Sequence, residues 1–193
     1  MKRLICFGDS ITAKEVSDDG TERLTPRLRY GLGSWGWEVI NAGISGNNSR
    51  DALLRVERDI VSQSPDLVTV LFGANDAATH KMIKLEEYKT NLLTIVQKIT
   101  PEKTVLISPS PVDESRPKNR TNDVIKEYSN VVNQVAIETG SQFIDLFSEM
   151  IIYPDYSKML RDGLHYTESG YKFLSQLILI KIIDNYKISV CSI

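Results

Sequence analysis

Ser10, Asp162 and His165 lie far apart in the sequence but are residue types that catalyse acyl transfer when they come together. A serine hydroxyl is a poor nucleophile at neutral pH and needs a neighbouring base to take its proton. Histidine suits that task because its unperturbed pKa lies near neutrality. An aspartate can then fix the tautomer of the histidine and stabilise its protonated form. Asp162 and His165 are three positions apart, so a turn places both side chains on one side.

Acyl transfer also needs hydrogen-bond donors where negative charge develops on the reacting oxygen. The sequence offers three candidates, which are the backbone N–H of Ser10, the backbone N–H of Gly46 and the side-chain amide of Asn75. Each of them follows an apolar run of the kind that forms a buried strand. Glycine suits such a position because it permits close approach and unusual backbone angles. We therefore predict that these three groups form an oxyanion hole.

Each of these residues also has a simpler interpretation. Serine is a good helix N-cap, so Ser10 is also explained as the start of the next element. Gly46 is equally explained as a turn glycine, Asn75 as a helix cap, Asp162 as a loop carboxylate and His165 as a core residue. The joint occurrence of suitable types at successive strand ends favours the catalytic interpretation over the separate ones.

The elements that must position these residues alternate regularly along the chain. Short apolar runs bounded by glycine, proline or polar residues predict strands, and stripes of apolar residues at helical spacing predict helices between them. The predicted strands cover residues 4–8, 37–40, 67–72, 104–107 and 143–146, and the last helix follows Thr167. Such alternation indicates a parallel sheet covered on both faces, in one α/β domain over residues 1–193. Open sheets of this kind bind ligands at the carboxyl ends of their strands.

Two further patterns have the appearance of other binding sites. Residues 31–36 spell G-x-G-x-x-G, but this run follows a predicted helix and opens a strand, which is the inverse of a dinucleotide-binding fingerprint. Arg116, Lys118 and Arg120 lie in a proline-rich loop after the fourth strand. Three charges in such a loop are more typical of a solvated surface than of a phosphate site.

Composition excludes several classes of function. The chain has 193 residues and a net charge of −2, so no strong field attracts nucleic acid or anionic membranes. No apolar run has the length of a membrane span, since Lys181 interrupts the nearest one. We expect no secretory signal at the N-terminus. Cys6 and Cys191 indicate no disulfide framework, which favours a cytoplasmic protein.

The two histidines and two cysteines give no ligand spacing for zinc, so we predict neither a metal nor a cofactor. His80 lies between Asn75 and the helix that follows. It either lines the pocket mouth or lies on a surface loop, and the second interpretation is favoured.

Four segments of the chain, FGDSIT, NAGISGNNS, LFGANDA and DGLH, resemble the four sequence blocks of the SGNH hydrolases, also called the GDSL esterase/lipase family. The resemblance extends from residue 4 to about residue 183. Within the family, the segments LEEYKTNL, SPSPVDE and DGLHYTESGY make the chain most similar to the isoamyl acetate-hydrolysing esterase group. The resemblance implies a three-layer α/β/α sandwich with a five-stranded parallel sheet, the flavodoxin-like fold of that family. It also implies that Ser10 is the nucleophile, that Asp162 and His165 complete the triad, and that Gly46 and Asn75 complete the oxyanion hole.

Ile11 stands where the family has the leucine of its GDSL motif, a conservative change that affects none of the expected catalytic residues. The G-x-S-x-G elbow of the larger α/β hydrolases is absent. We therefore expect a serine esterase that acts on a small carboxylic ester without a metal. Alternatives within the family are a carbohydrate deacetylase, a thioesterase or a lysophospholipase, and outside enzymes an inactive binding module. Polar rim loops predict a shallow pocket, with Ile11, Ile44 and Phe72 as its apolar residues. The sequence does not determine the oligomeric state.

Overall fold

The structure, a computed structural model, describes residues 1–116 and 119–186, and within them five parallel strands form one sheet in the order β2-β1-β3-β4-β5. The strands are β1 (Lys2–Gly8), β2 (Trp37–Gly43), β3 (Leu67–Leu71), β4 (Thr104–Ile107) and β5 (Gln142–Ile144). This order is the flavodoxin-like one, with the reversal of strand order at β1. The predicted fold class is confirmed.

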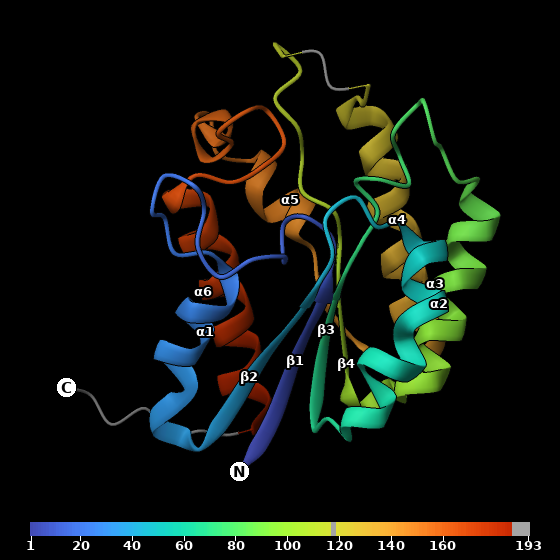
Figure 1. Cartoon of the computed structure of the whole chain (residues 1–193). Coiled ribbons are helices and arrows are strands. Elements are labelled where there is room, and N and C mark those ends of the chain that lie inside the picture. Colours follow the sequence, from blue (N-terminus) through green and yellow to red (C-terminus); the bar gives the residue numbers. More distant parts are fainter. Residues whose placement is uncertain (117–118, 187–193) are drawn as a thin grey trace.

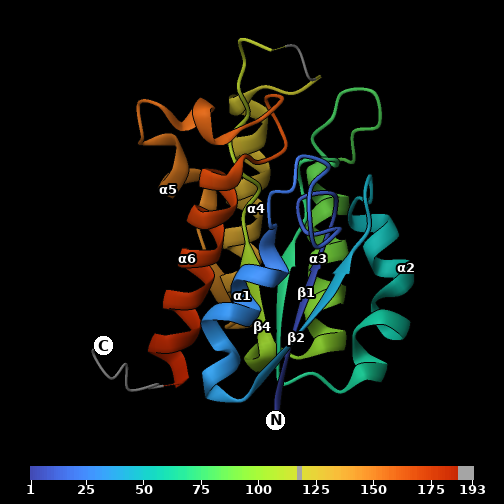
Figure 2. The same cartoon turned by 60° about the vertical axis from the view of Figure 1, so that its left-hand side comes forward.

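Helices cover both faces of the sheet (Figures 1 and 2). One face carries α2 (Ser49–Asp59), α3 (Leu85–Ile99) and α4 (Asn122–Thr139). The opposite face carries α1 (Leu24–Leu32) and α6 (Glu168–Tyr186). The short helix α5 (Leu146–Ile151) follows β5 and places side chains in the cores on both sides.

Strict alternation of side chains divides the interior into two cores. On β1, Ile5 and Phe7 pack under α2 and α3, whereas Leu4 and Cys6 face α1 and α6, and all four are fully buried. A central parallel strand is apolar on both faces because helices cover both of them. The carboxyl ends of β1 to β4 lie at the upper edge of the sheet in Figure 1, opposite the N-terminus, and β5 is parallel to β4.

The G-x-G-x-x-G run has the inverted context that the sequence indicated. Gly31 lies inside α1, a 3₁₀ turn follows at Gly33–Trp35, and β2 begins at Trp37. This context does not match a dinucleotide-binding turn, which follows a strand and opens a helix.

Several element boundaries differ from the prediction: β1 begins at Lys2, β2 extends to Gly43 and β3 ends at Leu71. The fifth strand ends at Ile144, since the Asp145 side chain accepts a hydrogen bond from the N–H of Ser148 at 3.1 Å and so caps α5. The sequence pattern does not predict α5 itself, because six residues are too few to show a clear helical period. The chain beyond residue 184, for which the sequence gives no prediction, continues α6 to Tyr186, and Cys191 lies outside the described residues.

In the part of the chain that the structure describes, no helix combines the length and the apolar character needed to cross a bilayer.

Candidate active site

Ser10 lies in a tight turn directly after β1, at the carboxyl edge of the sheet. Asp9 closes this turn, because its carboxylate accepts from the N–H of Ile11 at 2.9 Å and its carbonyl accepts from the N–H of Ala13 at 2.9 Å. Aspartate forms such turns readily through a bond to the backbone two residues on. The next helix, α1, begins only at Leu24, so Ser10 is not a helix N-cap.

His165 connects Ser10 to Asp162. Its Nε2 lies 3.0 Å from the Oγ of Ser10, and its Nδ1 lies 2.8 Å from Oδ2 of Asp162. The other carboxylate oxygen, Oδ1, accepts from the backbone N–H groups of Leu164 at 3.0 Å and His165 at 2.8 Å. The loop before α6 therefore holds the aspartate and the histidine in one fixed arrangement.

The same contacts set the ionisation of Asp162. Burial alone raises the pKa of this carboxyl, but the hydrogen bonds from the side chain and backbone of His165 and from Leu164 outweigh it and hold the pKa well below its usual range. An ionised Asp162 accepts a hydrogen bond from Nδ1–H of His165. The neutral ring then presents Nε2 as an acceptor to the hydroxyl of Ser10.

Gly46 lies on the loop between β2 and α2 with φ at +83°, a left-handed angle that glycine adopts without steric cost. Its carbonyl accepts from the Nζ of Lys81 at 3.0 Å. Among residues 1–116 and 119–186, no acceptor pairs with the backbone N–H of Gly46 or of Ser10. Both groups can therefore donate to a substrate oxygen at this edge of the sheet.

Asn75 is buried at the carboxyl end of β3, and its amide contacts the neighbours of both Ser10 and Gly46. Nδ2 donates to the carbonyl of Asn47 at 2.9 Å and lies 3.3 Å from Oδ2 of Asp9. Oδ1 accepts from an Nη of Arg120 at 3.2 Å. The next helix, α3, begins at Leu85 with Lys84 as its N-cap residue, so Asn75 does not cap it.

Two buried carboxyl groups lie beside these residues and have no distinct signal in the sequence. Burial raises the pKa of Asp9 to about 6, although the hydrogen bond from Ile11 opposes the shift. Burial also raises the pKa of Asp76, whose Oδ1 accepts from the N–H of Ser49 at 2.9 Å. Their places in the sequence could have identified them, because Asp9 directly precedes Ser10 and Asp76 directly follows Asn75.

Arg55 of α2 contacts the carboxyl ends of β1 and β2 and the loop that follows β2. Its guanidinium donates to the carbonyl of Gly8 at 2.9 Å, the carbonyl of Ala42 at 2.8 Å and Oδ1 of Asn47 at 2.7 Å. The same group lies 4.5 Å from the ring centroid of Phe7. Sequence reasoning missed it because an arginine on an amphipathic helix is usually on the solvent face.

Arg23 and Arg120 hold the turns that carry Ser10 and Asn75. Arg23 is buried, donates to the carbonyl of Ser10 and lies 5.1 Å from the ring centroid of Tyr171. Arg120 donates to the carbonyl of Ala74 in addition to Asn75. The interpretation of the proline-rich loop as a set of solvated charges is thus wrong for Arg120.

The remaining loop charges and the second histidine have simpler positions. Arg116 is exposed, as the sequence indicated, and Lys118 lies outside the described residues. His80 is exposed on the loop that leads to α3, which agrees with the favoured interpretation. Ile44 is also exposed and does not line the cavity beside Ser10.

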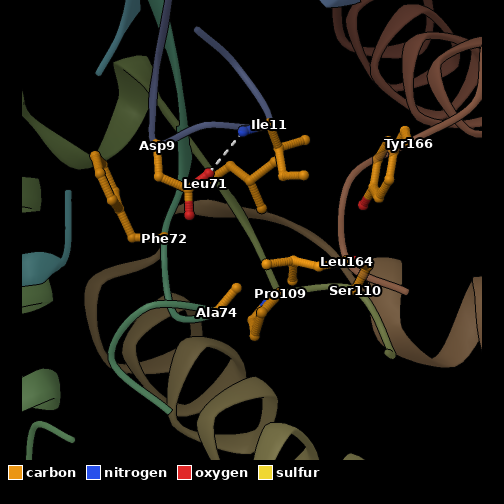
Figure 3. Close-up of a pocket in the computed structure, with 9 residues that line it drawn as sticks. All are labelled: Asp9, Ile11, Leu71, Phe72, Ala74, Pro109, Ser110, Leu164 and Tyr166. Atoms are coloured by element: carbon orange, nitrogen blue, oxygen red, sulfur yellow. Dashed lines mark hydrogen bonds between the residues drawn. The ribbon is translucent and has the colours of Figure 1, made fainter. Parts of the chain in front are cut away.

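A small apolar cavity lies inside the edge of the sheet, next to these groups (Figure 3). Its volume of about 10 Å³ has room for roughly one water-sized group. Ile11, which directly follows Ser10, and Leu164, which directly precedes His165, both line it. Asp9 and Ser110 also line it, and its apolar side chains are Ile11, Leu71, Phe72, Ala74, Pro109, Leu164 and the ring of Tyr166.

The chain matches the model of the GDSL-like lipase/acylhydrolase family over residues 6–173. It is 34% identical to a human protein named isoamyl acetate-hydrolyzing esterase 1 homolog, over 89% of this chain and 77% of that one. It is 33% identical to an acetylxylan esterase of Geobacillus stearothermophilus, over 94% of both chains. Among solved structures, the lipase/acylhydrolase from Enterococcus faecalis superposes with a TM-score of 0.89 at 33% identity, covering 96% of this chain and 97% of that one.

Proposed function

Because the chain belongs to the GDSL-like lipase/acylhydrolase family and is a carboxylic ester hydrolase, we propose that it cleaves its ester through an acyl-enzyme on Ser10. The observation that carries this proposal is the continuous row of hydrogen bonds from Ser10 through His165 to Asp162. A serine next to a base that is itself oriented by a carboxylate is the arrangement that nucleophilic catalysis requires.

In the proposed reaction, the Oγ of Ser10 attacks the ester carbonyl carbon while its proton moves to Nε2 of His165. Asp162 stabilises the imidazolium through Nδ1–H. The tetrahedral intermediate then expels the alcohol, which takes the proton from Nε2 and leaves the acyl group on Ser10. In the second half of the reaction, water attacks the acyl carbon while Nε2 of His165 takes its proton. The bond between the acyl carbon and Oγ then breaks, the acid is released, and His165 returns the proton to the Oγ of Ser10.

We assign the oxyanion hole to the N–H of Ser10, the N–H of Gly46 and the Nδ2 of Asn75. The sheet order supports this assignment, because β1 lies between β2 and β3 and the loop carrying Ser10 is flanked by the other two. The unpaired N–H groups of Ser10 and Gly46, within the part of the chain that the structure describes, also support it. Nδ2 of Asn75 donates to Asp9 and to Asn47, which are the chain neighbours of Ser10 and Gly46, so its donor side faces both loops.

The proposed substrate is an ester with a short acyl group, acetyl above all. The names of two relatives specify acetyl esters, one of isoamyl alcohol and one of xylan, so the acyl group is shared and the alcohol differs. The cavity beside Ser10 has room for a methyl-sized group only. The acetylxylan esterase relative makes a carbohydrate deacetylase the second candidate. No feature of the described residues favours the thioesterase or lysophospholipase alternatives.

A fluorophosphonate probe tests the nucleophile directly, since it labels only a serine that a neighbouring base activates. We expect labelling of the wild-type protein and none of Ser10→Ala, together with loss of p-nitrophenyl acetate hydrolysis in that variant. Exposed Ser169→Ala serves as a labelled control. Labelling or near-wild-type turnover in Ser10→Ala contradicts the assignment, and a probe-inert wild type supports the inactive binding module.

We propose further that residues 1–193 act as one domain, because the five strands share one sheet and the helices of both faces pack on it. The cytoplasmic location, which rests on the use of cysteine, stays a prediction.

A further inference from the structure

The amide of Asn75 is useful to an oxyanion only when its nitrogen, and not its oxygen, faces the reacting group. A carboxamide can turn by 180° about its last side-chain bond, which exchanges donor for acceptor with little change in shape. The contacts around this amide therefore decide whether it can act in the reaction.

The contacts of Asn75 are compatible with one orientation. Its Oδ1 accepts from Arg120 at 3.2 Å and its Nδ2 donates to the carbonyl of Asn47 at 2.9 Å. After a 180° turn, the amide NH₂ would face the guanidinium, donor against donor, and the amide oxygen would face the carbonyl oxygen. An arginine has no acceptor and a carbonyl has no donor, so neither partner can adapt.

Arg120 also fixes the backbone that carries the amide. Its guanidinium donates to the carbonyl of Ala74, the residue before Asn75. One residue earlier in the same loop, the carbonyl of Asn119 accepts from the N–H of Thr79 at 2.9 Å. The turn after β3 is therefore tied at both ends to the segment that leads into α4.

We propose that Arg120 is a positioning residue of the oxyanion hole, which holds Nδ2 of Asn75 towards the turn of Ser10. The inference rests on the proposed function, since it requires that Asn75 donates to the oxyanion. Donation to Oδ1 also polarises the amide, which makes its N–H a stronger donor. The guanidinium remains charged throughout the working pH range.

The test uses Arg120→Met, which keeps the aliphatic part of the side chain and removes the donors. We expect kcat for p-nitrophenyl acetate to fall about 10-fold with KM nearly unchanged, a smaller loss than the roughly 10²–10³-fold expected when the donor itself is removed in Asn75→Ala. Arg120→Lys retains one donor and the charge, and is expected to recover part of the lost kcat. Arg58→Met, an exposed arginine on α2, is the matched control and should keep the wild-type kcat.

A double-mutant cycle separates positioning from general destabilisation. In the Asn75→Ala background, Arg120→Met should change kcat by less than about 2-fold, because the amide that it orients is gone. Binding of an alkyl boronic acid, which forms an anionic adduct on the serine, should weaken in Arg120→Met by the same factor by which kcat falls.

The outcomes distinguish this inference from the function on which it rests. If Asn75→Ala leaves kcat intact, the proposed oxyanion hole is wrong and this inference is wrong with it. If Asn75→Ala lowers kcat but Arg120→Met does not, or lowers it equally in both backgrounds, only the positioning role is overturned. If Arg120→Met fails to fold, Arg120→Lys takes its place in the double-mutant cycle. A loss of kcat in Arg120→Lys that is equally large in the Asn75→Ala background would overturn the positioning role of Arg120.

Discussion

Asp9 shows at the scale of one residue how the nucleophile is held by groups that do not react. Its carboxylate fixes the turn through the N–H of Ile11 and lies 3.3 Å from the amide of Asn75. It is also buried, which raises its pKa to about 6 against the opposing hydrogen bond from Ile11. A carboxyl group that holds its proton more tightly in the folded state makes stability depend on pH.

The sign of that dependence comes from the two protonation states. An aspartate in an unfolded chain has a pKa of about 3.9, below the folded value of Asp9. Its contribution to stability is therefore complete below about pH 4 and is lost as the pH rises through about 6. We expect the free energy of unfolding of the wild type to fall by roughly 2–3 kcal/mol relative to Asp9→Asn between about pH 4 and pH 7.

Urea denaturation at a series of pH values measures this difference. Asp162, whose pKa is lowered, and Asp76, whose pKa is raised, are present in both proteins, so their direct contributions cancel in the comparison. Parallel pH profiles of wild type and Asp9→Asn would show that Asp9 titrates as in the unfolded chain.

At the scale of the elements, the sequence predicts the periodic segments and misses the short ones. The strands on either side of β1 and the helices over them are predictable from apolar runs and stripes, because burial imposes a period. The six-residue α5 is too short to show a helical period, so the prediction extends the fifth strand to residue 146. The candidate triad and oxyanion residues are recognisable because each has a reactive side chain or lies at a strand end.

The supporting arginines were not predictable in the same way. Arg55 belongs to a polar helix sequence and Arg120 to a charged loop, where arginine is usually solvated. Only the folded arrangement brings the carbonyl oxygens of Gly8 and Ala74 within reach of these two guanidinium groups. A periodic pattern carries no signal for such contacts, because they join segments that are distant in the sequence.

The start of α2 allows a prediction at this scale, because the capping residue Asn48 lies two positions after Gly46. Oδ1 of Asn48 accepts from the N–H groups of Arg50 and Asp51, and Asp51 accepts in return from the N–H of Asn48 at 3.0 Å. Removing an N-cap side chain costs about 1 kcal/mol. We expect Asn48→Ala to lower the free energy of unfolding by about that amount.

Asn130→Ala is the matched comparison, since Asn130 is exposed within α4 and alanine is the better helix former there. It should leave stability unchanged or raise it slightly in the same urea titration. Equal effects of the two substitutions would mean that the cap contributes nothing to the folded state.

At the scale of the whole molecule, the topology brings the candidate site together. The reversal of strand order at β1 places the ends of β2 and β3 on either side of Ser10, and the chain then returns after β5 to bring His165 over the same edge. Residues 155 positions apart in the sequence thus share a hydrogen bond. The order of the four sequence blocks does not by itself predict that Ser10 and His165 meet. That expectation comes from the family resemblance.

The rim of the site is polar on the side of the loop between β1 and α1. Glu15 pairs with Arg29 and Lys14 pairs with Asp18. Asp19 pairs with Arg161, which directly precedes Asp162. Exposed pairs of this kind contribute little to stability, but they make the surface of this loop mostly charged, with Val16 as an exposed apolar side chain. A long acyl chain that extends over this rim would stay in contact with water.

The cavity beside Ser10 sets the expected substrate range. Each buried methylene contributes about 0.8 kcal/mol only where protein atoms cover it, and a cavity of about 10 Å³ covers little beyond the methyl of an acetyl group. We expect kcat/KM for p-nitrophenyl esters to be highest from acetate to butyrate and to fall for longer chains. Leu164→Ala removes part of the cavity wall and should shift the maximum to longer acyl groups, whereas Leu54→Ala, an exposed position on α2, should not. The series from acetate to palmitate, measured below the micelle concentration of each ester, decides between these substrate classes, and a maximum at dodecanoate or beyond would favour the lysophospholipase alternative over the short-acyl esterase.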